Sequence, residues 1–246
     1  MQLPNVNASS DVYLDHTDCF EGAAEAWIDA EVITPEQTKA VADCLTLVSA
    51  SATTLRTAAS ATNAADRGAT KLRARYRVRD VILDLRIMGV GDALLNGLCD
   101  RNHAHPKYRY VFDGGTAGDL AAAKVREEPE LAADALVRLQ KIEDFPGKQA
   151  AADQLGDAVK RSLDVRKDLD AAEKAENAAG NDELHARLEV RKALETAYGM
   201  LVAAFPGKRH FVESFFLKAA RKDAATPATP GKPTTPIPLT PASTTG

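Results

Sequence analysis

The sequence echoes itself faintly, and this repetition restricts the folds open to the chain more than any other feature. Residues 72–79 (Leu-Arg-Ala-Arg-Tyr-Arg-Val-Arg) are echoed by residues 184–191 (Leu-His-Ala-Arg-Leu-Glu-Val-Arg). The triplet at 63–65 (Asn-Ala-Ala) recurs at 177–179, so the two copies are offset by roughly 113 residues. Repetition at a fixed offset indicates one supersecondary unit that is used twice.

The composition indicates which kind of unit is repeated. Apolar residues make up 45% of the 246 residues, yet only 5% are aromatic, and alanine is frequent. Alanine together with Leu, Glu, Arg and Lys favours helices on intrinsic propensity. The net charge of −4 gives no overall attraction to nucleic acid or anionic lipid. No apolar run approaches the ~20 residues of a membrane helix, so we expect no membrane partner.

The N-terminal residues and the cysteines bear on the compartment. Residues 1–18 contain no Lys or Arg and no apolar core, which argues against a secretory signal. The three cysteines (Cys19, Cys44 and Cys99) are too widely spaced for a disulfide framework. We therefore expect a cytoplasmic protein.

Proline positions divide the chain. Six of the twelve prolines lie between Pro227 and Pro241 in a Thr/Pro-rich stretch, which predicts a disordered tail over 224–246. The predicted segments before it are an N-terminal segment with a short helix (1–34), a first helical hairpin unit with an aromatic-basic end (35–118), a linking helix (119–146) and a second helical hairpin unit (147–223).

A helix start and a heptad pattern define the first unit. Thr34-Pro35-Glu36-Gln37 has the features of a capping box with proline at the first helical position. Small and apolar residues then recur in alternating four- and three-residue steps, which predicts a close helix–helix seam. They are Val41, Leu45, Val48, Ala52, Leu55, Ala59 and Thr62.

The predicted hairpin turns depend on two glycines. In the second unit a helix over 148–176 is followed by Gly180-Asn181, which predicts a tight turn. By analogy the first unit would turn near Gly68. Two alternatives stay open there: one continuous helix through Gly68, or a strand over 71–79, where basic and apolar residues alternate.

Aromatic residues gather near the end of each unit. We expect them to plug the ends of the bundle with apolar area that the alanine-rich seams lack. They are Tyr108, Tyr110 and Phe112 in the first unit and Phe205, Phe211, Phe215 and Phe216 in the second.

Three arginines fall on the predicted seams. Arg79 and Arg191 occupy equivalent positions of the two units, and Arg166 lies on the seam of its own helix. A buried arginine must be paired, and the candidate partners are Asp80, Asp84, Asp170, Glu173 and Glu195. The equal alternative is that the stems lie along the groove with their charged ends in water.

Two clusters are weak candidates for a metal site. His16 lies near Cys19, and Cys99 lies near His103 and His105. Zinc requires a closed set of about four such ligands. Because residues two apart point to nearly opposite sides of a helix, the spacing of His103 and His105 does not favour a site on a helix. We expect no metal and no cofactor.

A glycine pair after an apolar run resembles a nucleotide-binding loop. Gly89-Val90-Gly91 follows residues 80–88, but the third glycine, Gly97, is misplaced for that motif. The alternative is that the glycines allow close helix packing. The basic residues of 71–79 would divide between two sides of a helix, which argues against nucleic-acid binding.

Taken together, the patterns predict an all-α fold of two related antiparallel helical hairpins forming a bundle, with accessory helices and a disordered tail. No nucleophile stands in a recognisable catalytic signature. The predicted function is a non-catalytic structural or assembly subunit that forms homo-oligomers. The alternatives are an adaptor that binds a partner protein through a groove and a metal- or nucleotide-dependent enzyme.

Overall fold

The computed structural model describes residues 3–217, and within that range the chain forms helices and no strand. The all-α prediction is thereby confirmed for this part of the chain; the predicted tail lies outside it. None of these helices combines the length and the apolar character needed to cross a bilayer. In chain order they are α1 (Ser10–Asp29), α2 (Pro35–Gly97), α3 (Pro106–Val111), α4 (Ala117–Ala121), α5 (Glu128–Lys141), α6 (Lys148–Ala204) and α7 (Arg209–Glu213).

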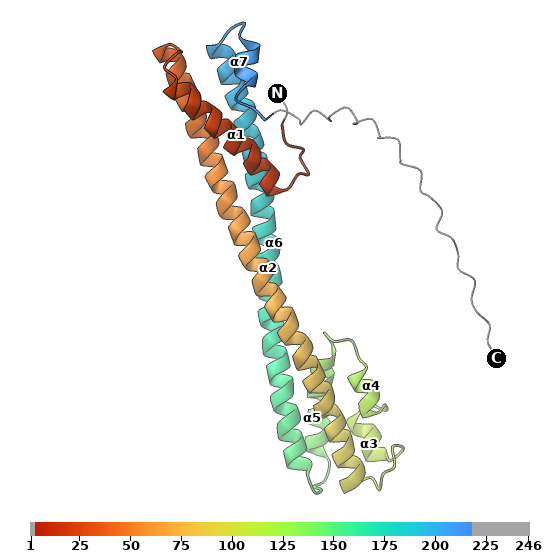
Figure 1. Ribbon diagram of the computed structural model, residues 1–246. Helices are drawn as coiled ribbons and strands as arrows, with labels where there is room; N and C mark the ends of the chain where they lie inside the picture. The colour runs from red at the N-terminus through yellow and green to blue at the C-terminus, as the bar shows by residue number, and fades with distance from the viewer. Residues whose placement is uncertain (1–2, 218–246) are drawn as a thin grey trace, which may run out of the picture.

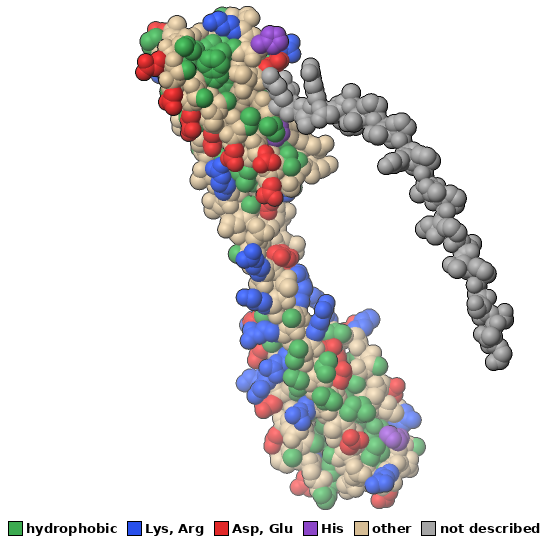
Figure 2. All heavy atoms as spheres, viewed as in Figure 1, with side chains coloured by type: hydrophobic (Ala, Val, Ile, Leu, Met, Phe, Trp, Pro, Cys, Tyr) green, Lys and Arg blue, Asp and Glu red, His purple; other side chains and the backbone are tan. Residues whose placement is uncertain are grey.

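Two very long helices form the frame of the molecule. α2 has 63 residues and α6 has 57, and they run antiparallel along almost their whole length (Figure 1). α1 and α7 lie at one end of this arm, while α3, α4 and α5 lie at the other (Figure 1). The result is an elongated molecule with a thick part at each end and a narrow waist between them (Figure 2).

α2 begins and packs as its sequence predicts. The side chain of Thr34 accepts a hydrogen bond from the amide of Gln37, and the amide of Thr34 donates to Oε1 of Gln37, so the predicted capping box is confirmed. Every seventh residue of α2 then turns inward, and all but Thr62 are buried. These residues are Val41, Val48, Leu55, Thr62, Ala69, Tyr76, Leu83 and Val90. A strict seven-residue repeat is the period of a left-handed coiled coil.

Apolar side chains form two separate cores, one at each end. The first contains Phe20 of α1, Val48 of α2 and Leu194 of α6. The second contains Leu83 of α2, Tyr108 of α3 and Leu155 of α6. Between them lies the waist, which we define as residues 62–73 of α2 and 173–183 of α6. Ala69 is the one buried residue of these two segments.

The two predicted hairpins are wrong. α2 passes through Gly68 and α6 passes through Gly180 without a turn, so each predicted hairpin is one straight helix, and the strand alternative over 71–79 is wrong as well. A glycine inside a helix costs only about 1 kcal/mol. Pairing of the two long helices with each other offsets that cost, because it supplies a partner for both seams along the whole arm.

The Phe-Pro-Gly-Lys tetrapeptide marks both ends of α6. It occurs at 145–148, where α6 begins, and at 205–208, just after α6 ends. Gly147 and Gly207 have φ angles of +88° and +75°. Glycine adopts this left-handed region without steric cost, which lets the chain change direction sharply at each end of the helix.

Gly89 and Gly91 lie inside α2, so the strand and loop of a nucleotide-binding motif are absent. A Cβ atom added to Gly91 would come within 2.8 Å of the Cβ of Ala117 in α4, whereas one added to Gly89 would meet nothing within 4 Å. Gly91 therefore serves the close approach of α4 to α2, which is the packing role that the sequence offered as an alternative.

This difference predicts opposite effects of the same substitution. Gly91→Ala should lower the free energy of unfolding by about 1–3 kcal/mol, because the added methyl group has no space. Gly89→Ala should raise it by about 0.5–1 kcal/mol, because alanine restricts the unfolded chain and favours the helix. Denaturant unfolding of the two variants and the parent checks this. Equal effects of both substitutions would contradict the packing role of Gly91.

The lack of apolar burial at the waist predicts a local difference in opening. Amides of residues 62–69 should exchange with deuterium at least about tenfold faster than those of residues 44–55 and 83–94, since regions with few buried apolar contacts open at lower free energy. Hydrogen exchange followed by mass spectrometry of peptides from α2 measures this. Uniform protection along α2 would show that the two cores unfold as one unit through the waist.

Candidate functional site: a charged clamp beside the waist

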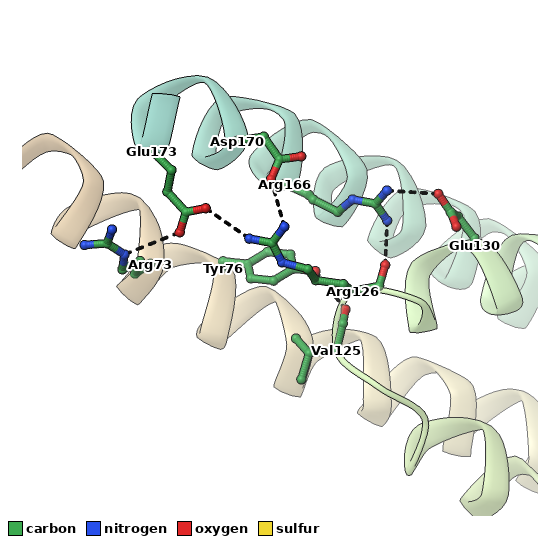
Figure 3. A network of polar contacts seen from close by, with 8 residues as sticks. All are labelled: Arg73, Tyr76, Val125, Arg126, Glu130, Arg166, Asp170 and Glu173. Atoms are coloured by element: carbon green, nitrogen blue, oxygen red, sulfur yellow. Dashed lines mark hydrogen bonds and ion pairs between the residues drawn. The ribbon is translucent and has the colours of Figure 1, made fainter. Parts of the chain in front are cut away.

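Arginines and carboxylates from three segments meet where the waist joins the second core. Arg126, in the loop before α5, contacts two carboxylates of α6: its Nη1 lies 3.3 Å from Asp170 and its Nη2 lies 3.0 Å from Glu173 (Figure 3). Nε of Arg73 in α2 also lies 3.5 Å from the carboxylate of Glu173. Arg73 reaches Glu176 as well, at 2.5 Å. One carboxylate of α6 thus joins α2 to the loop.

Two further side chains hold the backbone of the same loop. Nη1 of Arg166 donates to the carbonyl oxygen of Arg126 at 2.6 Å, and its Nη2 lies 3.0 Å from Glu130 (Figure 3). The hydroxyl of Tyr76 donates to the carbonyl oxygen of Val125 at 2.7 Å. We call Arg73, Tyr76, Arg126, Glu130, Arg166, Asp170 and Glu173 the charged clamp.

The side chains of the clamp are used to position elements. Its arginines are paired with carboxylates, and the hydroxyl of Tyr76 is already used as a donor. It contains no serine, cysteine or histidine that could act as a nucleophile or base. Each partly exposed ion pair stabilises by about 0.2–1 kcal/mol, so the clamp acts as a network that fixes the loop before α5 against both long helices.

A buried carboxyl group lies next to the clamp. Glu128, at the start of α5, is 1% exposed, and its Oε1 has no hydrogen-bond partner; the same holds for Oδ1 of Asp84 in α2. Burial, together with the neighbouring carboxylates of Asp84 and Asp80, raises the pKa of Glu128 to about 9. Glu128 is therefore protonated at neutral pH and can donate a hydrogen bond to Asp84.

This protonation links stability to pH. The pKa of Glu128 rises from 4.5 to about 9 on folding. Its contribution to folding is therefore complete below pH 4.5 and is lost progressively as the pH rises toward 9. Glu128→Gln keeps a neutral donor at every pH. It should raise the free energy of unfolding on the order of 2 kcal/mol at pH 8 and by much less at pH 5.

Urea unfolding of the parent and Glu128→Gln at pH 5, 6.5 and 8 measures this effect. Asp134→Asn is the matched control, because Asp134 is an exposed carboxylate on the same helix. A stability gain for Glu128→Gln that did not grow with pH would show that Glu128 is ionised in the folded protein.

The structure does not bring the predicted metal ligands together. His16 is buried in α1, where burial lowers its pKa, and Cys19 lies one turn further along. Cys99 is fully buried. The ring of His103 packs edge-on against Tyr108 at 5.2 Å, and Nδ1 of His105 accepts the amide of Lys107 at the start of α3. No group of three His, Cys, Asp or Glu residues within 3–217 is arranged to hold a metal ion.

The three seam arginines have different surroundings. Arg166 belongs to the clamp. Arg191 lies 3.2 Å from Glu195, one of its predicted partners, and donates to the carbonyl oxygen of Pro4 at 2.6 Å. Arg79 is half-buried and has no ion pair or hydrogen bond within residues 3–217; it lines a groove between α2 and α6. Only Arg166 and Arg191 thus join separate segments.

The aromatic residues lie at the two ends of the arm. Phe205, Phe211, Phe215 and Phe216 surround the C-terminal end of α6 with Phe20 and Trp27 of α1; the rings of Phe205 and Phe211 are 4.3 Å apart. Tyr108 and Phe112 belong to the second core, with ring centres 4.9 Å apart. Tyr110 points outward and is 47% exposed.

α2 also has an exposed row of apolar side chains. Val78, Val81, Leu85 and Met88 are 59%, 56%, 66% and 43% exposed. They follow one another in steps of three and four residues on the side of α2 that faces away from the buried seam, so we call them the apolar stripe. These four residues were not among the predicted site residues, although their heptad spacing is present in the sequence beside that of the buried row.

Comparisons of the chain with protein-family models, with curated proteins and with solved structures each give no match.

Proposed function

We propose that this protein is a non-catalytic helical structural or assembly subunit that associates with itself. The observation that carries the proposal is the apolar stripe. Single exposed apolar residues are common, but four in heptad spacing have the pattern of a helix–helix seam. Exposed to water over about three turns of α2, this pattern favours a partner helix.

The elongated shape supports a structural role. At 1.5 Å per residue, the 63 residues of α2 extend about 95 Å. The arm has a core at each end, and the accessory helices leave much of its sides exposed. This shape suits lateral association more than enclosure of a small molecule. We place the protein in the cytoplasm and expect protein partners.

We further propose that the chain is an internal duplication whose unit is a helix, a long helix and a short aromatic helix. In this interpretation α1, α2 and α3 correspond to α5, α6 and α7. The two echoed triplets at 63–65 and 177–179 lie opposite each other at the middle of the arm, where Thr62 donates to the carbonyl oxygen of Ala179 at 3.0 Å. This central position is expected when two copies pair antiparallel.

A second candidate function is an adaptor for a partner protein. A groove of about 500 Å³ lies between α2 and α6 beside the apolar stripe, and Ala74, Val78, Ile82 and Val165 line it. A single helix from another protein would fit against such a surface as well as a second copy of this chain would.

The mass of the protein in solution separates these two functions. Light scattering on a sizing column should give a defined oligomer for the full chain and for a chain that ends at Asp223, because the proposed contacts lie on the helices. A monomer for both, at concentrations up to about 100 μM, would contradict self-association and favour the adaptor function. An oligomer for the full chain alone would place the contacts in the residues after Asp223.

A further inference from the structure

We propose that the occupant of the apolar stripe is a second copy of this chain, which docks with the outer face of α1 in an antiparallel dimer. This inference rests on the proposed self-association and names its interface. It follows from three observations: unpaired positive charge beside the stripe, a row of acidic residues on α1, and the matching placement of the two.

The apolar stripe has arginines on both sides. Arg75, Arg77 and Arg79 have no ion pair or hydrogen bond within residues 3–217, although neighbouring Arg73 is fully paired in the charged clamp. Arg75 and Arg77 are exposed. An apolar row flanked by unpaired arginines fits a helix that combines acidic residues with small or apolar ones.

α1 has the complementary surface. Five of its six acidic residues recur in steps of four, three and seven residues along one exposed side: they are Asp11, Asp15, Asp18, Glu25 and Asp29. Asp18 is paired with Arg56 of α2, while the other four have no ion pair within residues 3–217. Val12, Gly22 and Ala26 are exposed beside them and supply apolar or small contacts for the stripe. Residues 3–38 contain no Lys or Arg.

The two surfaces also match in position. At 1.5 Å per residue, the acidic row from Asp11 to Asp29 is about 27 Å long; the stripe from Val78 to Met88 is about 15 Å long, and about 26 Å when the basic residues from Lys71 onward are included. α1 packs on the first half of α2, whereas the stripe occupies the second half, so the waist lies between them. An antiparallel pair with its two-fold axis at the waist places each acidic row against the other copy's stripe.

Both kinds of charge are visible on one face of the molecule. Figure 2 shows acidic side chains gathered over the end that contains α1, and Lys and Arg side chains gathered over the waist and just below it. A face that is acidic at one end and basic toward the other is complementary to itself only when the two copies run antiparallel. Two identical contacts then close the assembly as a dimer, so no filament grows.

A polyanion such as RNA is the other binding partner that unpaired arginines suggest. The structure favours a protein surface, because four exposed apolar side chains lie beside the arginines, and Asp80 and Asp84 interrupt the basic run. A phosphate backbone gains nothing from such apolar contacts. The experiment below distinguishes RNA binding from self-association.

Charge reversal tests the interface. The double variant Arg75→Glu/Arg79→Glu and the double variant Asp11→Lys/Asp15→Lys should each weaken the dimer about 100-fold or more, since like charges then face each other. An equimolar mixture of the two variants should recover a dimer, because each reversed surface meets its complement. The matched control is Lys160→Glu/Lys167→Glu, which reverses two exposed lysines on α6 and should leave the dimer intact.

Mass by light scattering, at 50 and 500 mM salt, is the measurement for all four proteins and for the mixture. If the parent is a monomer, the proposed function and this interface both fail. If the parent is a dimer that neither double variant weakens, self-association stands and this interface is wrong. Failure of the mixture to form a dimer also overturns the interface, as does a parent that stays monomeric until a 20-nucleotide RNA is added.

Discussion

The buried seven-residue repeat of α2 is the constraint on which the rest of the structure depends. From Val41 to Val90 the same side of the helix turns inward, and an antiparallel α6 gives that side a partner along its whole length. Each helix depends on the other, since helices in proteins owe most of their stability to packing against a partner. The accessory helices pack against the two long helices only at the ends of the arm, where the inward residues are large.

The polar waist follows from the same seam. Its inward positions on α2 are Thr62 and Ala69, and those on α6 include Glu173 and Glu176, which bury little apolar area. Apolar stabilisation is therefore concentrated at the ends. The charged clamp lies beside the waist because long arginines can span a gap that alanine and threonine leave between two helices. Ion pairs there fix the relative position of the helices more than they add stability.

Local features of the fold could be read from the sequence, whereas the pairing of distant segments could not. The capping box at Thr34 and the row that begins at Val41 depend on neighbours within one turn, so their patterns were sufficient. The turn at Gly180 was predicted wrongly because the cost of a glycine is local, while the partner that offsets it lies more than a hundred residues away. Glu128 gave no signal, since its raised pKa comes from burial in the folded protein and from Asp84 and Asp80 on another helix.

A two-helix arm cannot cover all of its own apolar residues, and this explains why the stripe is exposed. In a four-helix bundle each helix has two neighbours, so residues on two of its sides are buried. Beyond the waist α2 has α6 on one side and α4 against Gly91, but its outer side, with Val81 and Leu85, has no neighbour among residues 3–217. Both side chains are exposed, so the packing of the monomer does not require them to be apolar. Their apolar character supports the proposed contact with a second copy of the chain.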